Sequence, residues 1–94
     1  MMDEMRLREE FDTGLKKIRH EIKSRLVPHG LFGTVADIDL GQTGQIPDGS
    51  RIEIAVKGKI VSRSFDRQLI EGCCLRVRGE VLVAIIAMVD EVAN

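Results

Sequence analysis

Residues able to perform catalysis or bind a metal are few and scattered in this sequence of 94 residues. The two histidines, His20 and His29, have no neighbouring nucleophile and carboxylate arranged to activate one another. Asp37 and Asp39 alternate in an extended segment, which places both carboxylates on one side, about 7 Å apart by strand rise. This pair could bind a divalent cation or exchange protons, although a solvated sheet face is the simpler explanation. We therefore expect no catalytic residue, no metal site and no cofactor.

The two cysteines, Cys73 and Cys74, are adjacent. They cannot join distant segments, and a bond between them would strain the backbone. The chain has neither the Cys-x-x-Cys spacing nor the paired histidines of a zinc site. We interpret the pair as one small buried thiol beside one exposed thiol.

A glycine-rich stretch, Gly44-Gln-Ile-Pro-Asp-Gly-Ser-Arg51, has the two-glycine spacing of a phosphate-binding loop. Ser50 and Arg51 stand where that loop needs lysine followed by serine or threonine. The stretch also precedes an expected strand, so no helix amino terminus would face a phosphate. Turn chemistry is therefore the better interpretation.

The basic residues carry the clearest indication of binding. The net charge of −1 gives no overall field to attract nucleic acid or membrane. Basic side chains are nevertheless concentrated in the later half of the first expected helix and around an expected hairpin. If these segments adjoin, they form a patch that could contact a macromolecular partner. The predicted contact residues are Lys16, Lys17, Arg19, Lys23, Lys57, Lys59, Arg63 and Arg67.

Residues 3–26 are expected to form a long amphipathic helix. Apolar residues recur at spacings of three and four, which places them along one stripe of a helix. Gly14 is the weak point, costing about 1 kcal/mol against alanine unless a neighbour packs against it. Pro28 and Gly30 end the helix. The stripe consists of Leu7, Phe11, Leu15, Ile18, Ile22 and Leu26.

Three strands are expected next. Residues 31–40 alternate so that Ala36 and Ile38, with Phe32 and Leu40, would face inward and the two aspartates outward. A turn-rich segment, 41–50, separates this strand from a second one at 51–56. Lys57-Gly58 then favours a tight hairpin leading to a third strand at 59–63. One long strand with a bulge at Gly58 is the alternative.

The remaining segments are expected to be helical. Ser64 would cap a short helix that Gly72 stops, and residues 74–79 form either a short strand or a linker. The final helix begins at Gly79, and its apolar side spans about 160° of the helix circumference, with Val83 alone misplaced. This side is wider than one small sheet and one narrow helical stripe can cover, so a homodimer is a further expectation.

Together these elements predict a single α+β domain over residues 1–94. A long N-terminal helix precedes a three-stranded antiparallel meander, and a short helix and a C-terminal helix follow, with helices packed on one face of the sheet. No apolar run reaches eighteen residues, so no membrane span is expected. The charged amino terminus indicates no secretory signal, and a cytoplasmic location is the default expectation.

The order of elements is similar to the helix, three strands and helix of double-stranded RNA-binding domains. That resemblance implies a basic amino terminus on the last helix, directed at the RNA backbone. Here the helix starts Gly79-Glu80-Val81 and has no lysine there. All three phenylalanines fall at inward positions in this interpretation, which leaves no aromatic platform for single-stranded bases.

We therefore predict a small, soluble, non-catalytic protein that binds a macromolecular partner, in first place another protein. Regulators, adaptors and inhibitors of the bacterial or phage accessory kind have this character. The alternative is an RNA- or DNA-binding module that uses the basic residues of the first helix and of the 57–67 region.

Overall fold

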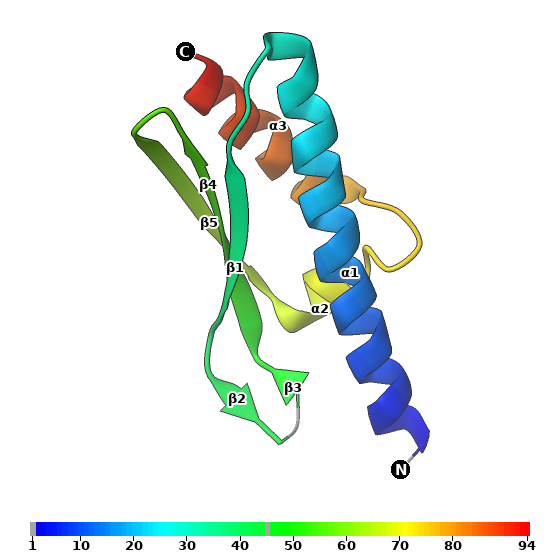
Figure 1. Ribbon diagram of the computed structural model, residues 1–94. Helices are drawn as coiled ribbons and strands as arrows, with labels where there is room; N and C mark the ends of the chain where they lie inside the picture. The colour runs from blue at the N-terminus through cyan, green and yellow to red at the C-terminus, as the bar shows by residue number, and fades with distance from the viewer. Residues whose placement is uncertain (1, 45) are drawn as a thin grey trace.

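The fold is α+β, as the sequence predicts, and Figure 1 shows the helices on the same side of a small sheet. The computed structural model describes residues 2–44 and 46–94. In chain order the elements are α1 (Met2–Leu26), the 3-10 helix η1 (Val27–His29), β1 (Thr34–Asp39), β2 (Gln42–Thr43), β3 (Ile46–Pro47), β4 (Gly49–Val56), β5 (Lys59–Asp66), α2 (Arg67–Glu71) and α3 (Gly79–Ala93).

The main sheet has the order β1-β4-β5, and both pairings are antiparallel. The predicted hairpin is confirmed, because Val56 pairs with Lys59 across a two-residue turn. Lys57 and Gly58 in that turn have φ values of 48° and 83°. Positive φ at both central residues defines the turn type that matches the twist of two adjoining strands.

The core lies between this sheet and the helices. The central strand β4 alternates as predicted, with Ile52, Ile54 and Val56 buried. The six-residue apolar stripe of α1 also points into the core, where Phe11 is buried and Leu7 is partly buried. The opposite face of the sheet has no helix over it, as is common for antiparallel sheets.

The facing predicted for β1 is wrong. Val35 packs against the core and Asp37 lies on the helix side, whereas Ala36 and Ile38 are exposed. Arg19 of α1 donates a hydrogen bond to Asp37, which places a carboxylate where the apolar pattern predicted isoleucine. The strand alternates as expected, but a partner on another element decides which set of side chains turns inward.

Phe32, just before β1, is 81% exposed rather than buried. The prediction that all three phenylalanines face inward therefore holds only for Phe11 and Phe65. The turn-rich segment before β4 contains the short hairpin β2–β3, and its Ile46 and Pro47 are buried. Gln45, within the predicted turn segment, lies outside the described residues.

The short helix α2 begins later than predicted, because Asp66 and not Ser64 is its cap. The Asp66 side chain accepts a hydrogen bond from the backbone N–H of Leu69 at 3.0 Å. Ser64 instead pairs with Arg51 in the sheet. Residues 74–78 contain no strand, so the linker interpretation is confirmed.

The final helix starts at Gly79 as predicted, but its buried face is rotated. Ala84 is buried, although the amphipathic pattern placed it on the polar side. Ile86, assigned to the apolar side, is 39% exposed. Val83, which the pattern placed outside that side, is 68% exposed as expected. The rotation follows from the position of α3, which packs against β5 and β4 and also touches α1.

None of the helices in residues 2–44 and 46–94 combines the length and apolar character needed to cross a membrane.

Gly14 marks the closest approach of α1 to α2. A Cβ atom at this position would lie 2.0 Å from the backbone oxygen of Ile70. The glycine that weakens α1 by itself thus permits two helices to meet.

Replacing Gly14 with alanine should therefore destabilise the fold, although the same change in a solvated helix gains about 1 kcal/mol. Moving α2 away costs about 1–3 kcal/mol, so we expect a lower midpoint of urea unfolding. Thr13→Ala, at the exposed neighbouring position, is the control and should raise the midpoint slightly. A Gly14→Ala protein as stable as the wild type would contradict this packing.

Candidate functional site

The eight predicted contact residues do not form one patch. Lys16 and Arg19 lie where α1 adjoins β1, and Lys23 follows Arg19 by one helical turn. Lys59 and Arg63 lie on β5, at the other edge of the sheet. The outer strands of a three-stranded sheet are about 10 Å apart, so the two groups flank the sheet from opposite sides.

The other three residues are dispersed. Lys17 is exposed on α1, Lys57 is exposed in the hairpin turn, and Arg67 is half-buried in α2. Within the described residues, Arg19 is the one member of the eight that forms an ion pair. The other seven charges stay available to a partner, and their role in binding stays a prediction.

A cleft of about 340 Å³ lies between α1 and β1, and both predicted carboxylates line it. Arg19 compensates the charge of Asp37 there, and the half-buried ion pair ties the first helix to the edge strand. Asp39 and Pro47 line the same cleft. No group of three potential metal-binding side chains occurs among the described residues. The cleft is therefore best explained as a structural contact.

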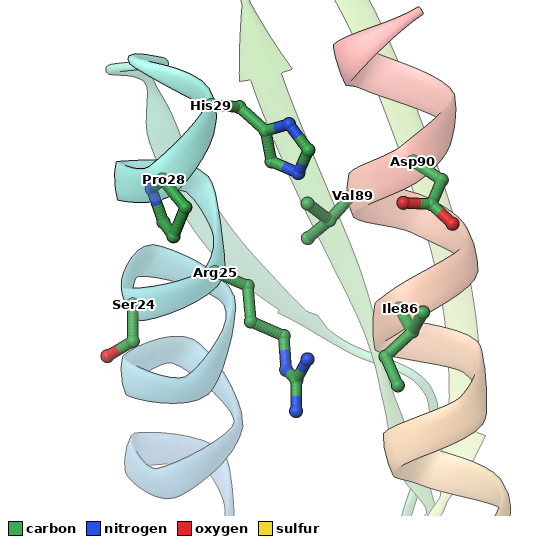
Figure 2. Close-up of a pocket in the computed structure, with 7 residues that line it drawn as sticks. All are labelled: Ser24, Arg25, Pro28, His29, Ile86, Val89 and Asp90. Atoms are coloured by element: carbon green, nitrogen blue, oxygen red, sulfur yellow. The ribbon is translucent and has the colours of Figure 1, made fainter.

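A second depression, the α1–α3 groove, lies between the end of α1 and the last turns of α3. Its volume is about 210 Å³. Figure 2 shows Arg25, His29 and Val89 pointing into the space between the helices. The groove has an apolar floor and charged walls. It is lined by Ser24, Arg25, Pro28, His29, Ile86, Val89 and Asp90.

Ser24, His29 and Asp90 are of the types found in a catalytic triad, but they are not arranged as one. The Ser24 hydroxyl points away from His29 (Figure 2). No hydrogen bond joins any two of the three within the described chain. His20, the other histidine, is exposed and lines none of the depressions described above. The geometry of the groove suits binding.

The α1–α3 groove continues into an exposed apolar flank of α3. Val83 and Ile86 on this helix are 68% and 39% exposed, and Val27 at the start of η1 is 62% exposed. The groove could not be identified from the sequence, because it depends on how α3 lies against α1. The excess width of the apolar side of α3 was the one available indication.

On the walls of the groove lie two charged groups, Arg25, which pairs with Glu21, and Asp90. The Nε atom of Arg25 donates to Glu21 at 2.8 Å, and its other guanidinium nitrogens make no hydrogen bond to a described residue. Asp90 forms no ion pair with the described residues. Opposite charges therefore face the groove from its two walls.

Two groups with shifted acidity lie elsewhere, around the linker before α3. Burial raises the pKa of the Cys73 thiol, and Cys74 beside it is half-buried. Burial also raises the pKa of Glu71, with Arg67 opposing the shift and Glu10 adding to it. The Oε2 atom of Glu71 is buried without a hydrogen-bond partner in the described chain.

No protein family, no curated protein and no solved structure matches this chain significantly. The site is therefore judged on its own geometry.

The raised pKa of Glu71 predicts a pH-dependent stability. Because the folded state holds this proton more tightly than the unfolded state, the ionised group destabilises the fold at neutral pH. The penalty disappears as the pH falls through the folded pKa toward the ordinary value of 4.5. Glu71→Gln should thus melt at a higher temperature than the wild type at pH 7, with a smaller difference at pH 4. Glu91→Gln, on the exposed face of α3, is the control; a Glu71→Gln advantage that grows on acidification would contradict the assignment.

Proposed function

We propose that this chain is a non-catalytic protein that acts by binding another protein, and that the α1–α3 groove with the adjoining flank of α3 is the contact surface. The proposal places the chain among regulators, adaptors or inhibitors rather than enzymes.

The observation that carries the proposal is the uncovered apolar flank of α3. Val83 is exposed beside the groove. The partly exposed Ile86 lines the groove together with Pro28 and Val89. Large apolar side chains grouped around a concavity are typical of protein contact sites, where an apolar centre is surrounded by polar residues. Here Arg25 and Asp90 supply that polar rim.

Catalysis has less support. In the α1–α3 groove, which His29 lines, the Ser24 hydroxyl is turned away from the histidine (Figure 2). The two groups with raised pKa values, Glu71 and Cys73, line other surfaces. An enzyme needs titratable groups that converge on one pocket.

Nucleic-acid binding has less support as well. The basic residues divide between the two edges of the sheet, and the turn segment 41–48 has no lysine or arginine. Phe32 is exposed, but a single aromatic ring is not a stacking platform. A continuous series of phosphate contacts would need the two basic groups on one surface.

Ile86→Asp should weaken partner binding. The partner is identified by affinity capture from host extract, purified, and titrated against the wild type and variants by calorimetry. A charge in the apolar centre should raise the dissociation constant about tenfold or more.

Leu75→Asp is the matched control, because Leu75 is 86% exposed on the linker away from the groove. Val83→Asp repeats the test at a more exposed position, and melting curves confirm that each variant is folded. Equal affinity of Ile86→Asp and wild type, or capture of nucleic acid alone, would overturn the proposal.

Lys16, Lys17 and Lys23 should affect the rate of association. Replacing all three with glutamate should slow binding of the same partner at low salt and have less effect at high salt, because salt screens exposed charges. The double variant Lys57→Glu/Lys59→Glu changes charges at the other edge of the sheet. Comparing the two variants shows which edge the partner approaches. Rates equal to wild type at every salt concentration for both variants would reject charge steering.

A further inference from the structure

We infer that the occupant of the α1–α3 groove is a second copy of this chain, bound through a twofold axis that sets the two α3 helices against each other. This inference rests on the proposed function, because it names the protein that the groove binds.

The surface contains both halves of such a contact. Val83 projects from α3 beside the groove, Ile86 on the same helix lines its edge, and the groove has a volume of about 210 Å³. In a twofold arrangement the same patch serves both subunits, so the projecting residues of each copy enter the groove of the other.

The charges on the groove walls also complement one another. Arg25 and His29 lie on the α1 side, and Asp90 lies on the α3 side. Arg25 pairs with Glu21 through its Nε atom, and Asp90 forms no ion pair with the described residues. We place the twofold axis so that Asp90 of each subunit meets the remaining guanidinium nitrogens of Arg25 in its partner. Such pairs give orientation as well as energy.

The free edges of the sheet are a poorer surface for the same contact. Pairing β5 with its own copy would gather the positive charges of Lys59 and Arg63. Pairing β1 with its own copy would bring the two Asp39 carboxylates to one edge, beside Asp37, whose charge Arg19 compensates. Like charges on paired strands are destabilising and keep edges apart. On the flank of α3, the exposed Val83 and Ile86 are uncharged and cause no such repulsion.

An exchange of charges between two variants tests this inference. Arg25→Glu and Asp90→Arg are purified separately, and their masses in solution are measured by sedimentation over a range of concentrations. Each variant alone places like charges across the axis twice, so its dimer should dissociate at least about tenfold more readily than the wild-type dimer. An equal mixture restores an opposite pair at both positions, and should dimerise about as well as the wild type.

The mixture distinguishes a contact between subunits from one within a chain, because an effect within one chain would not be repaired by mixing. Melting curves of both variants separate misfolding from lost association. Leu75→Asp is the control and should dimerise normally.

The outcomes separate the two proposals. In one outcome the wild-type chain stays monomeric, but the Ile86→Asp variant loses its affinity for a different captured protein. This result overturns the inference that the occupant is a second copy and leaves the proposed function in place. A wild-type dimer that both single variants retain also overturns this inference, because it places the axis elsewhere. In another outcome the wild-type chain is monomeric and the Ile86→Asp variant binds every captured protein normally. This result overturns both the proposed function and the dimer.

Discussion

The packing of helices onto the central strand β4 is the constraint on which the rest of the structure depends. β4 is paired on both sides in the main sheet, and its Ile52 and Ile54 are completely buried. Ile18 and Ile22 of α1 and Ile85 of α3 are likewise inaccessible to solvent. In so small a domain these few side chains provide much of the hydrophobic stabilisation. The positions of both sheet edges and of the α1–α3 groove follow from this arrangement.

The elements with strong local patterns were predictable from the sequence. The apolar stripe of α1 and the alternation of β4 each have one side that only a core can cover. The Lys57-Gly58 turn likewise follows from local backbone preference. In these segments local preference and tertiary packing agree, which is why their limits differ little from those expected.

The edge strand β1 shows why the rest was not predictable. Both of its faces contain apolar and polar residues, so the pattern alone does not decide which one turns inward. Arg19 on α1 and Ser50 on β4 decide it, the first by pairing with Asp37 and the second by donating a hydrogen bond to the Ile38 carbonyl at 3.2 Å. The α1–α3 groove has the same origin, since its walls come from opposite ends of the chain and Pro28-His29 looked like a simple helix end.

The hairpin turn between β4 and β5 has a consequence for the energetics of the chain. Lys57 adopts φ of 48°, and it is the one non-glycine residue with positive φ in residues 2–44 and 46–94. The left-handed region costs an ordinary side chain about 1–2 kcal/mol, and asparagine or glycine occupies it with less strain. The tip of the hairpin therefore keeps a lysine at a position where asparagine or glycine would adopt the same backbone with less strain. Because this turn is exposed and remote from the core, a substitution there could stabilise the domain without repacking any buried side chain.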